Sequence, residues 1–531
     1  MTYLAVPISG RTYAEAKGQI DTALAAGAEA IELRTDYIER LDVGVVRKLV
    51  SGVKGTDKQA VPIIVTCRDS KEGGANDYPL QLRIDVLAAA LEAGVDFVDL
   101  EYRNFTSPDS HAEIKKALSR SQKSRLILSA HDFEGKFEDI VGLFHRISAL
   151  HRGAIVKLVY TAKHINDCFE AFDLLHETSG ERIVFCMGEA GLISRILAKK
   201  LGSSVVFGSM DERSATAPGQ LTIDKLKGLY RHNSMNCDTE LYGVIADPVG
   251  HSLSPVIHNA CFESAGMNRL YLPLLVQGGR DAFNQFLDNV LARPWLDFRG
   301  FSVTIPHKEN ALDYVRTKKG FIEPLAEKIG AVNTLVFDER RATSDERRMS
   351  AYNTDYAGAL DAIISGMGIT RFGLRGMQVA VVGAGGVARA IVAGLVDAGA
   401  KLRIYNRTIA RAERLAGEFG CEYAGLNNLR NLDAKLLINC TSIGMHPHTD
   451  QTPVPAKYLK KGMIVFDTVY NPVETLLLRQ AGQVGAKTID GMSMFINQAA
   501  AQFRLFTGQQ PDTDLMRKTA IDSLKKAGRW G

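Results

Sequence analysis

Eight short apolar runs recur along the first 230 residues, and segments rich in Ala, Leu, Lys and Glu separate most of them. Fully buried parallel strands give such unbroken apolar runs, because both faces of each strand are covered. Eight strand–helix units within this length are typical of a (βα)8 barrel, or TIM barrel. The predicted strands are Tyr3–Pro7, Ala30–Arg34, Pro62–Cys67, Val95–Glu101, Leu126–Ala130, Ala154–Val159, Ile183–Met187 and Val205–Gly208.

The regular pattern stops at a hydrophilic stretch, and the chain then starts a new α/β pattern. We therefore assign residues 1–230 to the barrel and residues 231–240 to a linker. The second half is predicted to be a two-lobed α/β unit. Its first lobe spans residues 241–360 and is completed by residues 490–531, and its second lobe, a Rossmann nucleotide-binding domain, spans residues 361–489.

Two stretches of the second half are rich in charged or turn-forming residues. We expect Asp338–Ser350 and Met445–Thr452 to be loops. The sequence contains no internal repeat and no low-complexity segment, so repeat architectures are not predicted.

The charge and cysteine patterns exclude several classes of function. The 64 basic and 60 acidic residues leave a formal charge of +4 without a long basic run, so a nucleic-acid partner is not expected. No apolar run approaches the ~18 residues of a membrane span. Seven cysteines without a C-x-x-C pair predict neither a disulfide framework nor a metal site. Reduced thiols and a start without signal-peptide or transit-peptide features predict a cytoplasmic protein.

Polar and charged side chains follow several of the predicted barrel strands. Barrel enzymes place their chemistry at the carboxyl ends of the strands, so these residues are candidates for one active site. They come from the segments ELRTD, TCRDSKEGG, SAHD, AIVKLV, GLISR and ATAPGQ, and the candidates are Glu32, Arg34, Arg68, Glu72, His131, Lys157, Arg195, Thr216 and Gln220.

Lys157 is the most informative of these candidates. Strand alternation places Ile155, Lys157 and Val159 on one face, and both faces of a barrel strand are covered. Burial favours the neutral amine, which can attack a carbonyl carbon to form a Schiff base. The alternative is a lysine whose amine reaches solvent at the strand end. His131 and Glu72 could likewise be structural residues, and the arginines could be surface charges, but their expected convergence favours a catalytic site.

These motifs together resemble type I 3-dehydroquinate dehydratase, and the resemblance covers residues 1–228. It implies that Lys157 forms an imine with the substrate ketone and that His131 acts as general acid and base, oriented by Glu72. It also implies that Arg195 binds the substrate carboxylate. The residues that it assigns to the ring hydroxyls or to closing the site are Glu32, Arg34, Arg68, Thr216 and Gln220. Thr216 stands where serine is common in the family, and it keeps the hydroxyl.

The second half opens with a similar concentration of polar residues. Ser252 and Ser254 lie in a Gly/Pro-rich loop before a predicted helix, which suits carboxylate binding, although plain helix capping is the alternative. Lys308 follows the segment VTIPH, and Asp355 follows Asn353-Thr. A lysine and an aspartate beside one alcohol carbon can provide acid–base assistance to hydride transfer, whereas the alternative is a surface ion pair.

A glycine-rich segment follows the predicted strand that begins at Val379. Its pattern G-x-G-x-x-A, between a strand and a helix, is the dinucleotide-binding fingerprint. The next strand ends in Asn-Arg-Thr rather than in an acidic residue, so arginines are available for a 2′-phosphate and we predict NADP(H). For Arg411 the alternative is a solvated helix face. The predicted cofactor residues are Gly383, Ala384, Gly385, Gly386, Val387, Asn406, Arg407, Thr408, Arg411, Thr441, Met445 and Gly491.

The motifs GHSLSP, VTIPHK, AVNT, NTDxxG, GAGGxA, NRT, TSIGM and MxxxQAA together resemble shikimate dehydrogenase over about residues 241–525. The resemblance implies that Lys308 and Asp355 form the catalytic pair. The residues that it assigns to the substrate carboxylate and hydroxyls are Ser252, Ser254, Thr304, Asn333, Tyr470 and Gln498.

The order of the two modules resembles the plant-type bifunctional dehydroquinate dehydratase/shikimate dehydrogenases. The resemblance implies a lyase that converts 3-dehydroquinate to 3-dehydroshikimate and an oxidoreductase that reduces it to shikimate with NADPH, so the expected partners are small molecules. One alternative is a regulator built from decayed copies of these folds, against which the intact Lys157, His131, Lys308 and Asp355 argue. Another is a quinate dehydrogenase in the second half.

Overall fold

The computed structural model describes residues 2–54, 61–121, 123–338 and 348–526 of the 531-residue chain. The chain forms two compact units, Met1–Thr239 with Leu274–Gln277, and Glu240–Pro273 with Gly278–Gly531. Of the predicted loop Asp338–Ser350, residues 339–347 lie outside the described residues, as do residues 527–531 of the segment expected to complete the first lobe. The described ends of this predicted loop are strand residues, Asp338 at the end of one strand and residues 348–350 at the start of the next, so the prediction was wrong there. The second predicted loop, Met445–Thr452, contains no helix or strand.

The first unit is built on a parallel eight-stranded sheet in the order β7-β6-β5-β4-β3-β2-β1-β8, as predicted for a (βα)8 barrel. At the two ends of this order, the backbone N–H of Ser204 donates to the Arg182 carbonyl at 2.7 Å, which nearly closes the barrel. The strands are β1 (Tyr3–Ile8), β2 (Ala30–Arg34), β3 (Ile63–Thr66), β4 (Phe97–Glu101), β5 (Arg125–Asp132), β6 (Ile155–Thr161), β7 (Arg182–Met187) and β8 (Val205–Phe207).

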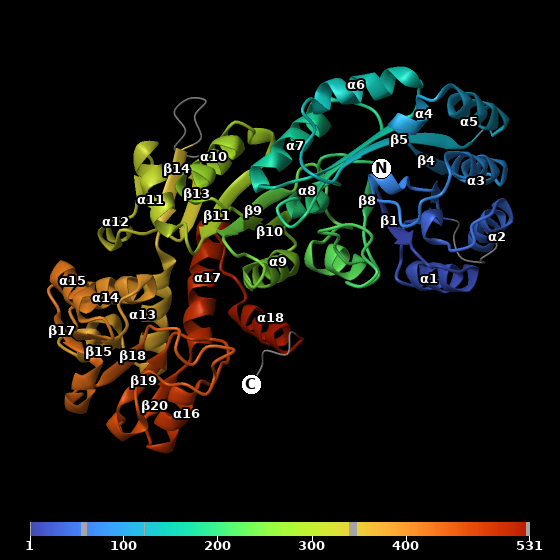
Figure 1. Cartoon of the computed structure of the whole chain (residues 1–531). Coiled ribbons are helices and arrows are strands. Elements are labelled where there is room, and N and C mark those ends of the chain that lie inside the picture. The colour runs from blue at the N-terminus through green and yellow to red at the C-terminus, as the bar shows by residue number, and fades with distance from the viewer. Residues whose placement is uncertain (1, 55–60, 122, 339–347, 527–531) are drawn as a thin grey trace. The chain divides into compact units, whose positions relative to one another are not determined.

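The barrel strands form because most of their residues are buried on both faces. Ile127, Ile155 and Ile183 fill the interior with other aliphatic and aromatic side chains. The helices cover the outside of the strands (Figure 1). The helical elements of this unit, including short helices in the loops, are α1 (Tyr13–Ala25), η1 (Thr35–Tyr37), α2 (Val43–Lys54), η2 (Ser70–Glu72), α3 (Leu80–Glu92), α4 (Tyr102–Phe105), α5 (Pro108–Arg120), α6 (Ile140–Leu150), η3 (Ile165–Asp167), α7 (Cys168–Glu177), α8 (Leu192–Leu197) and η4 (Lys225–Leu229).

The hydrophilic stretch 231–240 packs onto the first unit. His232, Met235 and Thr239 are buried, and the Lys199 ammonium donates to the His232 carbonyl at 2.7 Å. The second unit begins with the strand at Glu240.

The first lobe of the second unit contains a mixed six-stranded sheet in the order β10-β9-β11-β13-β14-β12. Strands β9 and β11 are parallel, whereas β13 is antiparallel to both β11 and β14. Its elements are β9 (Glu240–Ala246), α9 (Ser254–Ser264), β10 (Arg269–Leu275), α10 (Gly279–Leu291), η5 (Pro294–Leu296), β11 (Phe298–Val303), α11 (Lys308–Thr317), β12 (Phe321–Ile322), α12 (Pro324–Ile329), β13 (Thr334–Asp338) and β14 (Arg348–Tyr352).

The second lobe is a parallel sheet in the order β17-β16-β15-β18-β19-β20. Alternate residues of β15 enter two separate apolar cores, Val379 and Val381 on one face and Ala380 and Val382 on the other, as expected of a doubly wound Rossmann domain. Its elements are η7 (Arg371–Leu374), β15 (Gln378–Val382), α14 (Gly386–Asp397), β16 (Lys401–Asn406), α15 (Ile409–Phe419), β17 (Glu422–Gly425), η8 (Leu426–Asn431), β18 (Leu436–Asn439), η9 (Ala456–Tyr458), β19 (Ile464–Asp467), α16 (Leu476–Gln483) and β20 (Lys487–Ile489).

Three helices complete the second unit: α13 (Thr354–Met367), α17 (Gly491–Thr507) and α18 (Thr513–Lys526). Helices α13 and α17 lie side by side (Figure 1), and a Cβ on Gly358 would come within 2.7 Å of the Gln498 backbone nitrogen. Glycine at this position therefore permits the close approach of the two helices. No helix in the described part of the chain is long and apolar enough to cross a bilayer.

Candidate functional site

All nine candidates from the first half line one pocket of the barrel. They come from the barrel strands and from the segments that follow them, which include η2 for Glu72 and α8 for Arg195. Aromatic and aliphatic side chains, including Phe185 and Phe207, form the rest of the wall. The predicted residues at this pocket are Glu32, Arg34, Arg68, Glu72, His131, Lys157, Arg195, Thr216 and Gln220.

Lys157 is buried in this pocket, with only 4% of its surface exposed. Its Nζ donates to Asp99 Oδ2 at 2.8 Å and lies 3.8 Å from Glu32 Oε1. It also lies 4.6 Å from the centre of the Phe207 ring. The amine is therefore buried, as predicted, and the alternative of an amine that reaches solvent is wrong. The sequence did not predict that a buried carboxylate is paired with this amine.

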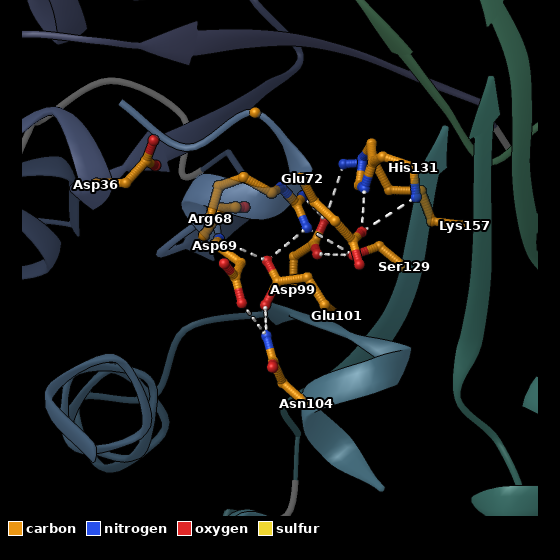
Figure 2. A network of polar contacts seen from close by, with 12 residues as sticks. Asp36, Arg68, Asp69, Glu72, Asp99, Glu101, Asn104, Ser129, His131 and Lys157 are labelled. Carbon is orange, nitrogen blue, oxygen red and sulfur yellow. Dashed lines mark hydrogen bonds and ion pairs between the residues drawn. The ribbon is translucent and has the colours of Figure 1, made fainter. Parts of the chain in front are cut away.

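The carboxylate partner belongs to a network of alternating charges behind Lys157 (Figure 2). Asp99 and Glu101, both fully buried, project from β4, and Arg68 contacts each of them at 2.9 Å. Arg83 contacts the second oxygen of Glu101 at 3.1 Å. Burial alone would raise the pKa of Asp99, but Arg68 and Lys157 hold that pKa well below its ordinary value. Each buried charge thus has an oppositely charged neighbour.

Sequence analysis did not select Asp99 and Glu101 as site residues. The sequence did contain a signal for them, since the two carboxylates occupy alternate positions of an apolar strand and therefore lie on the same buried face. Buried carboxylates need charged or hydrogen-bonding partners, which indicates a polar network. The same network uses Arg68, which was predicted to contact substrate. The guanidinium of Arg68 instead donates to Asp99, Glu101 and Ser129, although the side chain still borders the pocket.

His131 and Glu72 form a buried acid–base pair. Glu72 Oε2 lies 3.0 Å from His131 Nδ1 and accepts the His131 backbone N–H at 3.1 Å, so it fixes both the ring and the strand end. Burial raises the pKa of Glu72 to about 7. Burial, together with the positive charges of Arg68 and Lys157, lowers the pKa of His131 well below its ordinary value. Both shifts favour the uncharged forms, so the imidazole is available as a base near neutral pH.

Arg195 is the pocket's cation without an acidic neighbour. It is 3% exposed, and its guanidinium stacks on Phe185 with 4.5 Å to the ring centre and donates only to the Pro218 carbonyl, at 3.3 Å. Burial lowers the pKa of Arg195 to about 10. Among the described residues no carboxylate pairs with Arg195, whereas Arg34 is held by both oxygens of Asp36. This geometry suits an anionic group supplied by a ligand.

The loop over the barrel mouth holds the last two candidates. The side-chain oxygen of Gln220 accepts the Thr216 backbone N–H at 2.8 Å and the Thr216 hydroxyl at 3.3 Å. This contact keeps both side chains at the edge of the pocket.

A second pocket lies within the second unit, where the predicted substrate residues of that half meet. It lies between the carboxyl ends of β9 and β11, the start of α13 and the first turns of α17. The predicted residues that line it are Ser252, Ser254, Thr304, Lys308, Asn333, Asp355, Val387, Tyr470, Gly491 and Gln498.

Lys308 and Asp355 are paired in this pocket. The Lys308 ammonium donates to Asp355 Oδ2, and the amide of Asn333 donates to Oδ1 at 2.9 Å. Asn353 caps helix α13 by accepting the Asp355 backbone N–H, which fixes the aspartate in the first helical turn. Both charged side chains are mostly buried and line this pocket. The pair is therefore not an ion pair on the outer surface, and that alternative is wrong.

The remaining polar residues surround this pair. Ser254 is the first residue of α9, and its backbone N–H donates to the Ser252 hydroxyl at 3.3 Å. The Tyr470 ring stacks on Phe495 with 4.9 Å between ring centres, and burial raises the pKa of Tyr470. Gln498 projects from α17 into the same pocket. Several hydrogen-bonding groups therefore surround one space beside the Lys308–Asp355 pair.

The glycine-rich loop joins β15 to α14 at the carboxyl edge of the Rossmann sheet. Gly383 has a φ of +116°, which favours glycine, and a Cβ there would lie 3.1 Å from the Cys440 backbone. A Cβ on Gly385 or Gly386 would meet nothing within 4 Å. The loop therefore faces open space in front of a helix N-terminus, which fits a pyrophosphate group.

The other predicted cofactor residues lie along the same edge of the sheet. Asn406 ends β16, the exposed Arg407 and Thr408 follow it, and Arg411 is an exposed residue of the first turn of α15. Among the described side chains no carboxylate pairs with either of these arginines. Thr441 follows β18, which lies beside β15, and Met445 lies in the exposed loop beyond it. Of the twelve predicted cofactor residues, Val387 and Gly491 also line the substrate pocket. The substrate pocket therefore adjoins the edge of the Rossmann sheet where the cofactor is predicted to bind.

The described residues contain no cluster of three or more His, Cys, Asp or Glu side chains that could hold a metal ion. Their seven cysteines are unpaired thiols.

Comparison with known families divides the chain where its architecture changes. Residues 4–236 match the model of type I 3-dehydroquinase. Residues 244–335 match the shikimate dehydrogenase substrate-binding domain, and residues 368–467 match shikimate/quinate 5-dehydrogenase. Residues 491–521 match the shikimate 5′-dehydrogenase C-terminal domain.

One similar protein spans both halves. The bifunctional 3-dehydroquinate dehydratase/shikimate dehydrogenase, chloroplastic, of Arabidopsis thaliana is 38% identical over 497 residues, which cover 91% of this chain and 78% of the relative. The chain belongs to the bifunctional dehydroquinate dehydratase/shikimate dehydrogenase family. The predicted family, the fold of both halves and the combination of a lyase with an oxidoreductase are thereby confirmed.

Two further relatives of this bifunctional enzyme cover different shares of its chain. The shikimate dehydrogenase (NADP(+)) of Methanosarcina mazei is 42% identical over 297 residues, covering 54% of this chain and 99% of the relative. A solved structure of dehydroquinate dehydratase and shikimate dehydrogenase from S. pombe covers 98% of both chains at 23% identity, with a TM-score of 0.43.

Proposed function

We propose that this bifunctional enzyme dehydrates 3-dehydroquinate to 3-dehydroshikimate in its barrel and reduces 3-dehydroshikimate to shikimate with NADPH in its second unit. The observation that carries the first step is one buried pocket that holds an amine, the hydrogen-bonded His131–Glu72 pair and Arg195, which has no acidic partner among the described residues. A ketone bearing a carboxylate matches these three features. Family membership supports the pairing of the two reactions.

In the proposed dehydration, His131 takes a proton from the Lys157 ammonium, and the neutral amine attacks the ketone carbon. The carbinolamine hydroxyl then receives this proton from His131 and leaves as water, which forms the imine. Asp99 holds the amine in position, and Arg195 binds the substrate carboxylate. His131 then removes a proton from the carbon beside the imine, and the electron pair enters the conjugated system. The neighbouring hydroxyl leaves as water with a proton from His131, and hydrolysis of the imine releases the product and the free lysine.

In the proposed reduction, the residues of the second pocket handle the proton. Bound NADPH supplies the hydride. Lys308 lies beside Asp355 and donates a proton to the carbonyl oxygen that becomes the alcohol, while Asp355 and Asn333 orient the lysine. Ser252 and Ser254 are proposed to bind the carboxylate.

The cofactor is proposed to bind along the carboxyl edge of the Rossmann sheet. The glycine loop that ends at Gly385 would receive the pyrophosphate, and Arg407 and Arg411 would bind the 2′-phosphate. The Methanosarcina relatives carry NADP(+) in their names, which supports NADPH over NADH.

The domain bounds and the compartment stay predictions. We propose a barrel over residues 1–230, a linker over 231–240, a substrate lobe over 241–360 completed by 490–531, and a cofactor lobe over 361–489. The unpaired thiols support the cytoplasmic location, which cell fractionation tests.

Borohydride trapping tests the dehydratase proposal directly. Borohydride added with 3-dehydroquinate is expected to reduce the imine and leave a stable adduct on the Lys157 peptide, identified by mass spectrometry. The matched control is Lys157→Arg, which keeps a cation beside Asp99 but has no amine that can form the imine. We expect this variant to give no adduct and to lose dehydratase activity by about 10⁴-fold or more. An adduct on another lysine with Lys157 unmodified would contradict the assignment.

A further inference from the structure

A line of buried hydrogen bonds runs from the core of the second unit to the Lys308–Asp355 pair. It starts at Tyr271 in β10, which is fully buried and does not line the substrate pocket. The Tyr271 hydroxyl contacts the Ser302 hydroxyl at 2.5 Å, and Ser302 contacts Gln502 Oε1 at 2.7 Å. Gln502 Nε2 lies 3.1 Å from the Thr334 hydroxyl.

The line continues from Thr334 to the carboxylate. The Thr334 hydroxyl contacts Asn333 Oδ1 at 2.8 Å, and Asn333 Nδ2 contacts Asp355 Oδ1 at 2.9 Å. Tyr271, Ser302, Gln502, Thr334 and Asn333 are each at most 5% exposed. Ser302, Asn333 and Gln502 also border the substrate pocket, whereas Tyr271 and Thr334 are enclosed in the core.

Backbone contacts fix the direction of every proton in this chain. Gln502 Nε2 also lies 3.2 Å from the Asn333 carbonyl oxygen, which can only accept, so the opposite end of the Gln502 amide is the acceptor that faces Ser302. Asn333 Oδ1 likewise accepts the Thr354 backbone N–H at 2.8 Å, so its amino group faces Asp355. The hydroxyls between these amides must donate in the same direction.

Ser302 consequently has its one proton committed to Gln502, and the Tyr271 hydroxyl must supply the proton that Ser302 accepts. Hydrogen bonds that all point one way strengthen one another, and here they end on an anionic oxygen. We propose that Tyr271 is a positioning residue for the reduction step, acting through this ordered chain on Asp355. The inference rests on the proposed reductase function of this pocket.

The titratable group that packs on Tyr271 is His258, which also interacts with the Gln502 side chain of the chain. The His258 ring of α9 stacks on the tyrosine ring at 4.5 Å between centres, and burial lowers the pKa of His258 to about 3. His258 therefore stays uncharged at the pH values used in assays, and it brings no positive charge to the hydrogen-bonded chain.

Steady-state kinetics of Tyr271→Phe tests the proposal, with Tyr242→Phe as the matched control. Tyr242 lies buried in the adjacent strand β9, but its hydroxyl donates to the Phe506 carbonyl, outside the chain. We expect Tyr271→Phe to lower kcat for 3-dehydroshikimate reduction by about three- to tenfold, with the KM for NADPH unchanged. The KM for 3-dehydroshikimate should change by less than about twofold, because the chain positions the Lys308–Asp355 pair and Tyr271 does not border the substrate pocket.

The control variant should keep the wild-type kcat, and both variants should keep the dehydratase activity of the barrel. A Tyr271→Phe enzyme that binds NADPH but matches the control in kcat would overturn the proposal. If that variant does not bind NADPH, Ser302→Ala replaces it, because it keeps the tyrosine ring and breaks the chain at the next hydroxyl. Ser302→Ala should then show the same fall in kcat, and a wild-type kcat would overturn the proposal.

Combining the two substitutions separates a chain from two independent effects. Tyr271→Phe should have no further effect on kcat in the Ser302→Ala background, and an equal loss in both backgrounds would contradict a path through Ser302. A wild-type enzyme that does not reduce 3-dehydroshikimate would instead refute the proposed reductase function.

Discussion

At the scale of single residues, Asp99 determines how Lys157 is held. It is a fully buried carboxylate that contacts both Lys157 and Arg68, so Asp99→Asn leaves two buried cations without their shared counter-charge. We expect a destabilisation of the barrel of about 3–5 kcal/mol, measured by calorimetry, and loss of most dehydratase activity. Glu92→Gln, at the exposed Arg47–Glu92 pair of the same barrel, should change stability by less than about 0.5 kcal/mol. Equal effects of the two substitutions would contradict the role of the network.

The shifted pKa values of His131 and Glu72 predict how the dehydratase activity depends on pH. A base must be uncharged to accept a proton, and the pKa of His131 is lowered by burial, so kcat/KM should not fall as pH decreases through 6.5. Glu72, whose burial raises its pKa to about 7, should produce an inflection near that pH. Glu72→Gln cannot ionise and should abolish this inflection. An acid limb at pH 6.5 or above that persists in Glu72→Gln would show that His131 titrates as a solvated histidine and would contradict this prediction.

Single residues also show where the sequence was sufficient and where it was not. Lys157, His131 and Arg195 were predictable because each follows or occupies a recognisable strand and belongs to a motif. The Asp99 contact was not, because its partners lie 31 and 58 residues away and only the barrel brings them together. Burial was the one reason that the sequence provided for the reactivity of Lys157. That explanation was incomplete, because the contact with Asp99 forms only when the barrel folds.

At the scale of elements, the loop between β15 and α14 distinguishes folding from cofactor binding. Gly385→Ala adds a Cβ that meets nothing in the protein but would enter the space proposed for the pyrophosphate. We expect the KM for NADPH to rise about tenfold or more without loss of stability. Gly383→Ala should destabilise the lobe, because its φ of +116° and the nearby Cys440 backbone both oppose a side chain.

The control for this comparison is Gly417→Ala, within helix α15, where a Cβ also meets nothing within 4 Å. It should stabilise the lobe slightly, since alanine favours the helix, and leave the KM for NADPH unchanged. An unchanged KM in Gly385→Ala as well would remove the loop from the cofactor site.

Elements differ in how far their sequence determines them. The eight barrel strands were predictable because buried parallel strands are continuously apolar, and each lies within two residues of its predicted bounds. The antiparallel strand β13 and the two-residue β12 of the first lobe were not predicted individually. Their pairing depends on partners elsewhere in the sheet, and an exposed Phe321 in β12 gives no apolar run.

At the scale of the whole molecule, each candidate site lies within one unit. Among the described residues, the barrel pocket is lined by residues of the first unit and the Lys308–Asp355 pocket by residues of the second. Each chemical step should therefore survive removal of the key lysine of the other. Lys308→Met is expected to spare the dehydratase, and Lys157→Arg is expected to spare the reduction of 3-dehydroshikimate.

The amount of NADPH oxidised per 3-dehydroquinate supplied tests the central claim of two successive reactions in one chain. The wild-type enzyme is expected to oxidise one NADPH for each 3-dehydroquinate converted to shikimate. Lys157→Arg should oxidise none with 3-dehydroquinate and one with 3-dehydroshikimate, while Lys308→Met should stop at 3-dehydroshikimate. If folded wild-type protein formed no shikimate from 3-dehydroquinate and NADPH, or if one lysine substitution abolished both reactions, the account would be contradicted.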